Sequence, residues 1–303
     1  MTTTTTGTRT VERVVHSVST LEGAGFAVRR PFPTESLAIV DPFLLLDHLG
    51  PTTYGPGEAV GAPDHPHRGF ETVTYVLEGA VEHKDSTGGG GIIGHGDVQW
   101  MTAGGGIVHS EMPTDEIMRD GGTVHGFQLW VNLPRRDKMT QPRYQGIRLD
   151  QIPTGQSEDG KAKVKVIAGE SMGVSAVVET RTPIMYLHFT LQPGARVEQS
   201  VPGNYNAFAY VINGDVLAGD QGQQFHEGDA AVFAGDGDRV VWSVADAAPA
   251  PADVLLIAGV PLNEPVVHYG PFVMNTQEEI YQAIKDYHAG RIWTDSQIGL
   301  YEA

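Results

Sequence analysis

The sequence predicts an all-β protein built from two similar β-barrels. Its 303 residues exceed the usual size of one domain and suggest about two. The 38 glycines and 19 prolines indicate many tight turns, which favours short strands over a helical bundle. The segment AFAYVINGDV at 207–216 repeats the pattern of TVTYVLEGAV at 72–81, so one barrel-forming unit occurs twice.

The chain divides into five expected parts. They are a disordered, threonine-rich start (1–10), a first barrel (11–135), a polar and turn-rich linker (136–162), a second barrel (163–275), and a C-terminal helix and tail (276–303). The helix is expected because Thr276 and Glu279 have the spacing of a capping box. An apolar stripe at helical spacing begins at Ile280, and Gly290 stands where a helix would end.

Composition restricts the possible partners. The formal charge of −17 argues against direct binding to nucleic acid, which needs clustered Lys and Arg. Eight of the 20 basic residues fall between Arg135 and Lys165, where a solvated linker is favoured over a basic strip. The absence of cysteine excludes disulfides and thiolate metal sites. We expect a cytoplasmic protein that does not bind membranes, since no signal peptide or apolar span is present.

Two short motifs carry the candidate chemistry. His65 and His67 lie two residues apart in DHPHRGFETV, and His109 and Glu111 lie two residues apart in GIVHSEMP. Side chains at positions i and i+2 of an extended segment point to the same face. Each pair can therefore present both ligands to one point. Three imidazoles and one carboxylate suit a divalent transition metal such as iron, manganese, nickel, copper or zinc.

Other histidines of the first barrel are expected to be structural or solvated. His48 follows Asp47 at the polar end of a buried strand over 42–50. His125 shares a face with Phe127 and further apolar residues, so we expect a hydrogen-bonded core histidine there and not a fifth ligand.

The glycine run at 88–91 could be mistaken for a phosphate-binding loop. It has no following Lys-Ser/Thr pair and no helical continuation, so a hairpin loop is expected. His83 and His95 flank this run, and we expect both to be solvated.

Period-two counting assigns the faces of the strand after the first histidine pair. Val73 and Tyr75 share the parity of His67, whereas Thr74 has the opposite parity. The pattern predicts a strand whose metal-binding end opens onto an apolar interior. Glu71 also shares the parity of His67, which makes it a candidate to support the ligands.

The chain resembles the pirins, two-barrel members of the cupin superfamily. The resemblance rests on DHPHRGFETV, GDVQWMTAGGGIVHSEMP, HGFQLWVNLP and NEPVVHYGPFVMNT, and so spans most of the chain. It implies two tandem cupin barrels of jelly-roll type. It also implies that His65, His67, His109 and Glu111 are the metal ligands. In ordinary cupins the carboxylate ligand comes from the first motif, at about the position of Glu71.

The resemblance also implies an activity. Some pirins are quercetin 2,3-dioxygenases, which implies cleavage of a flavonol by dioxygen at one iron(II) per chain, with manganese, nickel, copper and zinc as the other candidates. Glu111 would then also accept the flavonol hydroxyl proton, as the catalytic residue. Other pirins are regulators that bind protein partners such as transcription-factor complexes or metabolic enzymes, with the metal as a redox sensor. An inert structural barrel is the third reading.

The second barrel lacks the paired ligands. Aligning Gly79 with Gly214 sets an offset of 135, which places Ser200 at the position of His65 and Pro202 at the position of His67. The metal is therefore expected in the first barrel alone.

Overall fold

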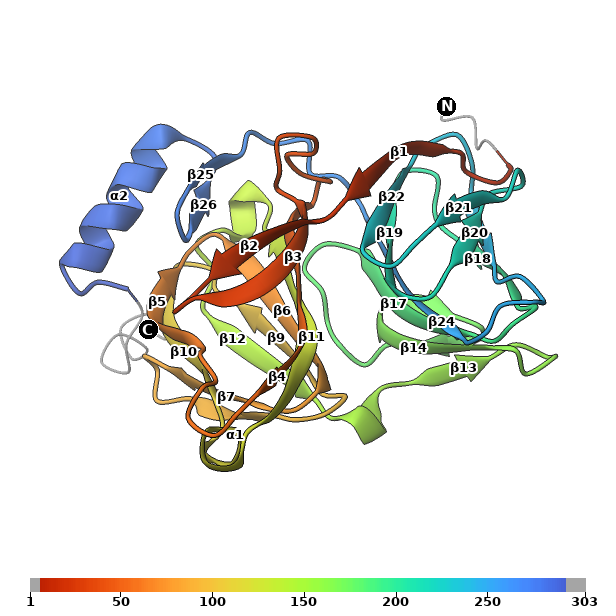
Figure 1. Ribbon diagram of the computed structural model, residues 1–303. Helices are drawn as coiled ribbons and strands as arrows, with labels where there is room; N and C mark the ends of the chain where they lie inside the picture. The colour runs from red at the N-terminus through yellow and green to blue at the C-terminus, as the bar shows by residue number, and fades with distance from the viewer. Residues whose placement is uncertain (1–5, 293–303) are drawn as a thin grey trace. The chain divides into compact units, whose positions relative to one another are not determined.

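A computed structural model describes residues 6–292, and strands make up most of its regular structure (Figure 1). The chain forms two units. Unit 1 comprises the described residues up to Val18, Pro31–Pro42 and Asp150–Pro261, and unit 2 comprises Ser19–Arg30, Phe43–Leu149 and the described residues from Leu262 onward. Each unit contains one seven-stranded and one four-stranded sheet. The predicted all-β class, with two jelly-roll-like barrels and a short C-terminal helix, is confirmed.

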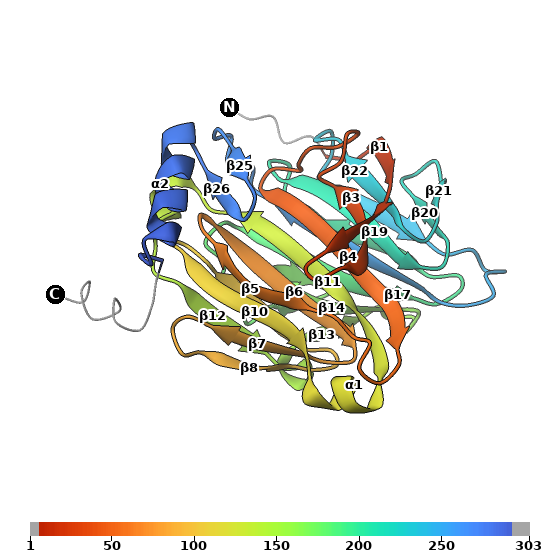
Figure 2. The same ribbon diagram turned by 60° about the vertical axis from the view of Figure 1, so that its left-hand side comes forward.

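Unit 2 contains the predicted ligand motifs. Its seven-stranded sheet has the spatial order β12 (Arg143–Ile147), β9 (Val98–Thr102), β6 (Phe70–Glu78), β11 (Gly122–Asn132), β4 (Phe43–Tyr54), β3 (Phe26–Phe32) and β2 (Val18–Glu22). Its four-stranded sheet has the order β5 (Ala62–His67), β10 (Ile107–Pro113), β7 (Val81–Asp85) and β8 (Gly90–Ile93). Figure 2 shows β5 and β10 side by side.

Unit 1 repeats this arrangement. Its seven-stranded sheet has the order β1 (Val11–His16), β22 (Asp229–Phe233), β19 (Asn206–Asn213), β24 (Ala252–Gly259), β17 (Ile184–Leu191), β14 (Ala162–Ala168) and β13 (Thr154–Gln156). Its four-stranded sheet has the order β18 (Arg196–Ser200), β23 (Arg239–Ser243), β20 (Val216–Ala218) and β21 (Gln223–Phe225). A separate hairpin pairs β15 (Glu170–Ser171) with β16 (Val174–Ser175). Strand for strand, the core of each sheet matches its counterpart in unit 2, as the internal repeat predicts.

The first strand of the chain belongs to unit 1. β1 pairs antiparallel with β22, with Val14 opposite Ala231. The prediction that 11–135 forms a single barrel is therefore wrong for its first residues. In unit 2 the edge position beside β9 is taken instead by β12. Sequence periodicity identifies a strand but not its distant partner, so this exchange could not be read from the pattern.

Residues 6–10 are ordered, contrary to the expectation for 1–10; residues 1–5 lie outside the described part. The buried Arg9 anchors this segment. Its guanidinium donates hydrogen bonds to the carbonyl oxygens of Gly237 (3.1 Å), Tyr205 (2.8 Å) and Pro202 (2.7 Å).

The segment 136–162 is not a plain linker. β12 within it pairs with β9, and β13 pairs with β14. Lys138, which precedes β12, is buried, and its ammonium donates to the carbonyl oxygens of Gly69 (2.8 Å) and Val273 (3.0 Å) and to Asn132 Oδ1 (2.7 Å). The cluster of basic residues is therefore not one exposed strip.

Asp47 and His48 are not at a polar strand end. They lie in the middle of β4, and both are buried. Asp47 accepts two hydrogen bonds from Arg30, at 2.7 and 2.6 Å. The ring of His48 stacks on that of Phe127 with centroids 4.4 Å apart. A strand of 12 residues continues past these polar positions because neighbouring side chains satisfy them.

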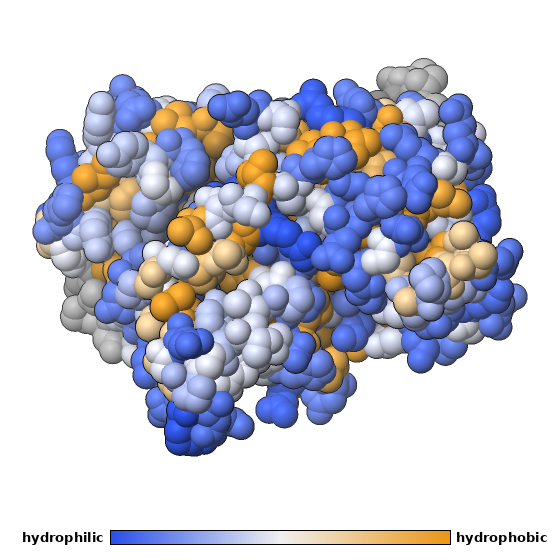
Figure 3. Space-filling view, in the orientation of Figure 1, coloured by the Kyte–Doolittle hydropathy of each residue, from blue (hydrophilic) through white to orange (hydrophobic). Residues whose placement is uncertain are grey.

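The C-terminal helix α2 (Gln277–His288) begins with the predicted capping box of Thr276 and Glu279. Its buried residues Ile280 and Ala283 pack on the hairpin of β25 (Val267–Tyr269) and β26 (Phe272–Met274). A shorter helix, α1 (Asp115–Asp120), was not predicted. Neither helix described for residues 6–292 is long and apolar enough to cross a bilayer. On the face shown in Figure 3, hydrophilic residues predominate and apolar residues form separate patches.

Candidate metal centre

Neighbouring strands bring the two predicted ligand pairs together. β5 contains His65 and His67, and β10 contains His109. In this antiparallel pair His109 lies directly opposite His65, and Ile107 lies opposite His67. Directly opposed residues have Cα atoms only about 5 Å apart. Strand pairing therefore places side chains of both motifs beside one another.

The three imidazoles converge. One ring nitrogen of each lies within 4.8 Å of the other two, and Nε2 of His65 is 3.0 Å from Nε2 of His67. Both ring nitrogens of His109 are buried and have no hydrogen-bond partner among the described residues. Buried polar atoms without partners destabilise a fold, and a cation bound by the three rings would satisfy them. The residues present therefore fit a divalent transition metal.

The surroundings hold the imidazoles in the form that binds metals. Nδ1 of His65 lies 2.8 Å from the carbonyl oxygen of Pro63, which can only accept, so Nδ1 carries the proton and Nε2 keeps its lone pair. Burial lowers the pKa of His67 and of His109 well below the ordinary value, and the neighbouring histidines lower both further. Neutral imidazole is the ligand form.

Glu111 stands two residues after His109, across a register shift in the β5–β10 pair. Its Oε1 accepts a hydrogen bond from Thr74 Oγ1 (2.8 Å), and its Oε2 accepts one from Gln128 Nε2 (3.0 Å). Among the residues described, the converging group contains the three histidines without Glu111. Each carboxylate oxygen has a further lone pair, so these bonds leave Glu111 able to bind a metal. Its role as the fourth ligand stays a prediction.

The sheet face beside the histidines differs from the predicted one. Thr74 and its direct cross-strand partner Gln128 both bind the carboxylate just described, so their face is turned to the site. Val73 then points to the opposite face. Assigning His67 to the face of Val73 was wrong because Gly69, with a φ of +90°, turns the chain between β5 and β6. Side chains alternate between faces only within one strand, so faces cannot be assigned by counting across such a turn.

Aromatic rings form one wall of the centre. The His67 ring lies edge-on to Phe70 and Trp130, with centroids 5.0 and 5.3 Å away. Phe70 and Trp130 are themselves 4.4 Å apart. Since the facing strand positions carry Thr74 and Gln128, the wall is part aromatic and part polar, and not uniformly apolar as the sequence predicted.

Glu71 forms a hydrogen bond away from the three histidines. It is buried, and its Oε1 accepts a hydrogen bond of 2.6 Å from Thr102 Oγ1. Alternation along β6 places it on the face opposite to that of Thr74. Within the described chain it does not join the converging histidines.

Sequence reasoning missed His83. It was expected to be solvated, but its ring is buried in β7, with its centroid 5.4 Å from that of His109 and 4.7 Å from that of Tyr144. Burial lowers the pKa of His83, against the opposing charges of Glu111 and Asp85. The sequence contained a sign of this burial. Glu82 and Lys84, on either side of His83, lie on the opposite face of the strand, where they form a surface ion pair.

His125 is hydrogen-bonded, as predicted, but it is only partly buried and not part of the core. Its Nε2 lies 2.7 Å from Nε2 of His48. The rings of His125 and Phe127 both stack on that of His48, so they share a face despite the register shift after His125.

The turn after His67 is fixed by other parts of unit 2. Arg68 is buried and donates to the carbonyl oxygen of Gly105 (2.6 Å) and to Asp286 of α2 (2.9 Å). A Cβ on Gly69 would lie 1.9 Å from a carbonyl oxygen of β26. The C-terminal hairpin and helix therefore position the end of the strand that carries His65 and His67.

Comparison with known proteins identifies the family. Models described as Pirin and as Pirin C-terminal cupin domain match residues 25–131 and 186–293. Pirin of Homo sapiens is 47% identical over 268 residues, covering 88% of this chain and 88% of that protein. The chain belongs to the pirin family. Pirin-like protein 2 of Arabidopsis thaliana is 48% identical over 275 residues, covering 89% of this chain and 81% of that protein.

Solved structures of pirin-like fold agree with this assignment. A crystal structure named quercetin 2,3-dioxygenase from Acinetobacter baumannii superimposes with a TM-score of 0.88 at 36% identity. The match covers 95% of this chain and all of that chain. The family resemblance predicted from the sequence motifs is confirmed.

Proposed function

We propose that this protein is a metal-dependent dioxygenase that cleaves a flavonol such as quercetin with dioxygen, with iron(II) as the metal. The proposal rests on the convergence of three buried or partly buried histidines, one of which has no other partner for its ring nitrogens. The similarity to the Acinetobacter quercetin 2,3-dioxygenase supports the reaction class. We assign His65, His67, His109 and Glu111 as the ligands of one metal per chain.

A divalent transition metal held there would supply Lewis acidity and exchangeable coordination positions. In this proposal Glu111 accepts the flavonol hydroxyl proton. The hydrogen bonds from Thr74 and Gln128, which hold its two oxygens in one orientation, support this role. The rings of Phe70 and Trp130 offer apolar surface against which a planar substrate can pack.

Tyr144 adds a hydrogen-bond donor near the site. Its hydroxyl is buried and lies beside the carboxylate of Asp85. Burial, then the charge of Asp85 and a hydrogen bond to it, and then the charge of Glu111 raise the pKa of this phenol. It therefore stays protonated at neutral pH and can donate to an oxygen atom of a bound substrate.

The test is reconstitution with iron(II) under anaerobic conditions, followed by addition of quercetin and dioxygen. Oxygen uptake and loss of flavonol absorbance should occur together, and only in metal-loaded protein. His67→Ala should abolish both, while His95→Ala, a change at an exposed histidine, should leave both unchanged. Iron-, manganese-, nickel-, copper- and zinc-loaded forms that all leave quercetin untouched would refute the proposal.

A metal-dependent regulator that binds a protein partner is the second candidate. The observation that favours it is the exposure of aromatic residues on the C-terminal segment of unit 2: Tyr269 is 63% exposed and Tyr281 is 58% exposed. Tyrosine is enriched where proteins meet. This candidate predicts a partner retained by metal-loaded but not by metal-stripped protein, with retention lost on Tyr281→Ser.

A further inference from the structure

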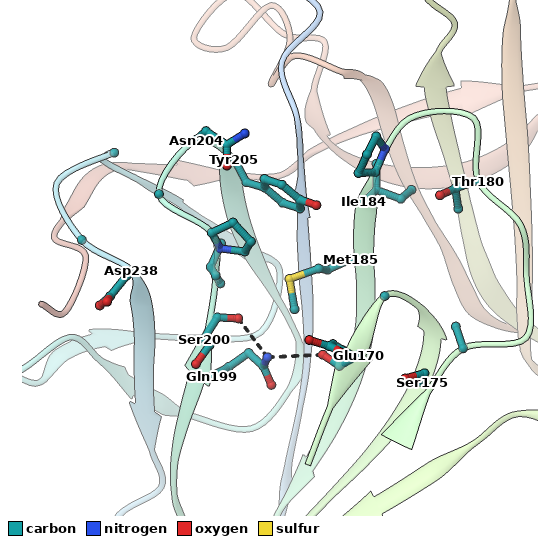
Figure 4. A pocket seen from close by; sticks show the side chains of 18 of the residues that line it. Glu170, Ser175, Thr180, Ile184, Met185, Gln199, Ser200, Asn204, Tyr205 and Asp238 are labelled. Carbon is teal, nitrogen blue, oxygen red and sulfur yellow. Dashed lines mark hydrogen bonds between the residues drawn. The ribbon is translucent and has the colours of Figure 1, made fainter. Parts of the chain in front are cut away.

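Unit 1 contains the second barrel of the sequence, and unit 2 contains the first. The second barrel has a large pocket at its mouth (Figure 4). Its volume is about 1090 Å³, and every residue that lines it belongs to unit 1. Part of the lining comes from the end of β18, which includes Ser200, and from the connection to β19, which includes Pro202. These are the positions that align with His65 and His67 of the first barrel. The pocket therefore occupies the counterpart of the metal centre.

The connection between β22 and β23 supports the same correspondence. It contributes Gly237 and Asp238 to the pocket. In unit 2 the matching connection, between β9 and β10, leads directly into the strand of His109. Barrel mouths are frequent ligand sites. Here the mouth persists without histidines, so its ligand must be recognised by other chemistry.

Apolar groups form the floor and one wall. Met185 and Val201 are buried and belong to the apolar core that fills the second barrel. In Figure 4 the ring of Tyr205 and the thioether of Met185 reach into the same space. This surface suits an apolar or aromatic body. The amide of Gln199 is already used, since it bonds Ser171 and the carbonyl oxygen of Ser200.

The charged side chains of the lining are the carboxylates of Glu170 and Asp238, and no described lining residue is Lys, Arg or His. The buried guanidinium of Arg9 lies behind the lining, where it donates to the carbonyl oxygens of Pro202, Tyr205 and Gly237. Asp238 is compensated, because it accepts from the Gly7 amide at 3.0 Å, lies 3.9 Å from Arg239 and interacts with the charge of Arg9. Glu170 is therefore the carboxylate left to attract a cation. Among residues 6–292, no hydrogen bond or ion pair engages the Glu170 carboxylate.

Glu170 and Tyr205 act on the same region of the pocket. Burial raises the pKa of the Tyr205 phenol, and the charge of Glu170 raises it further, so the carboxylate lies within electrostatic reach of the ring. Tyr205 is partly buried and packs against the core. A carboxylate beside a partly exposed aromatic face attracts a cation by charge and by the ring quadrupole. The Glu170 carboxylate would repel an anion. This pocket therefore differs in ligand charge from the proposed flavonol site of the first barrel, which would take a deprotonated hydroxyl.

We propose that the mouth of the second barrel is a metal-independent binding site for a small organic cation, an ammonium group carried on an apolar body. Glu170 is the charge determinant, the Tyr205 ring and Met185 hold the apolar body, and the site operates whether or not the first barrel turns over a flavonol. The proposal therefore does not depend on the proposed dioxygenase activity.

Three probes with one carbon skeleton test the charge preference: phenethylamine, 2-phenylethanol and phenylacetate. Each is titrated into the full-length protein, and binding is followed by chemical-shift changes of backbone amides that line the pocket. Phenethylamine should bind more tightly than the neutral alcohol, and phenylacetate should produce no saturable change. Equal binding of the amine and the alcohol, or no binding of the amine at millimolar concentration, overturns the proposal.

Matched variants test the two determinants. Glu170→Gln should weaken phenethylamine binding about threefold to fivefold, as expected for one exposed charge pair. Glu158→Gln is the control, because Glu158 is an exposed carboxylate before the first residue of β14, whereas Glu170 follows its last. Tyr205→Leu should weaken binding about threefold, whereas Tyr205→Phe should retain it, since the ring face persists.

A last variant tests independence from the metal. His109→Ala should bind phenethylamine as the unchanged protein does, because it alters only the first barrel. If Glu158→Gln weakens binding as much as Glu170→Gln, or if His109→Ala removes it, the second-barrel assignment is wrong.

Discussion

His48 should make the protein less stable as the pH falls below 6.5. Its side chain is fully buried in β4, between the ring of Phe127 and that of His125. Burial, then the charges of Arg29 and His125, lower the pKa of His48 from its ordinary 6.5 to about 2. The folded protein therefore holds this imidazole neutral throughout the range in which most proteins are studied.

The direction follows from which state binds the proton. Between pH 6.5 and about 2 the unfolded chain protonates His48 and the folded chain does not, so the free energy of unfolding decreases as the pH falls. Above pH 6.5 this contribution is fully present. Each pH unit below 6.5 removes about 1.4 kcal/mol, so the loss is about 2 kcal/mol at pH 5.

The substitution His48→Phe isolates this effect. A phenyl ring can keep the stacking on Phe127 but cannot bind a proton or pair with His125. The variant should lose about 1 kcal/mol at pH 7.5 from the missing hydrogen bond. At pH 5 it should be more stable than the unchanged protein by about 1 kcal/mol, because it avoids the loss of about 2 kcal/mol that protonation of His48 in the unfolded chain causes. The two stability curves should cross near about pH 6.

Guanidinium unfolding of metal-free protein, followed by tryptophan fluorescence from pH 5 to 8, measures both curves. His67 and His109, whose pKa values are also lowered in the fold, protonate on unfolding too, but they contribute equally to both proteins and cancel in the difference. His95→Asn, a change at an exposed position, is the control and should change stability by no more than about 0.5 kcal/mol. Parallel curves for His48→Phe and the unchanged protein would show that His48 is not the source of acid sensitivity.

Three further predictions concern the metal centre. Elemental analysis should find one transition metal per chain, and none after His65→Ala with His109→Ala; two equivalents, with one retained in the double variant, would refute the one-site assignment. Glu111→Gln should weaken metal binding or abolish turnover while Glu71→Gln keeps near-normal metal content, and the reverse pattern would make Glu71 the ligand. Gly69→Ala should lower the melting temperature by calorimetry, with a loss of about 2 kcal/mol or more, because its Cβ would meet a carbonyl oxygen at 1.9 Å; an unchanged melting temperature would show that this turn relaxes freely.

The ligand pairs and the duplication were predictable because both are local patterns. His65 and His67 share a face by strand geometry alone, and so need no knowledge of their partners. The repeat that aligns Gly79 with Gly214 likewise shows in the spacing of turns and strands, and the structure places β6 and β19 at matching positions in their sheets. Antiparallel pairing of β5 with β10 then makes one site from two motifs.

Other features depend on contacts that no local pattern encodes. His83 reads as a surface residue beside a glycine-rich hairpin until β7 is paired with β10, which turns it toward His109. The face of Thr74 was misassigned because one left-handed glycine, Gly69, reverses the count between two strands. Asp47 is tolerated in the middle of a strand because Arg30, on another strand, neutralises it.

The candidate metal centre depends on the C-terminal part of the chain, because the described residues from Leu262 onward belong to unit 2. Arg68 directly follows the candidate ligand His67, and it donates to Asp286, more than 200 positions later. Lys138 ties the same turn to β26 through the carbonyl oxygens of Gly69 and Val273. A fragment that ended with the first barrel would keep all three histidines and lose the groups that fix the strand end carrying two of them. The candidate ligands lie within fifty residues of one another in the sequence, but their arrangement depends on contacts across the whole of unit 2.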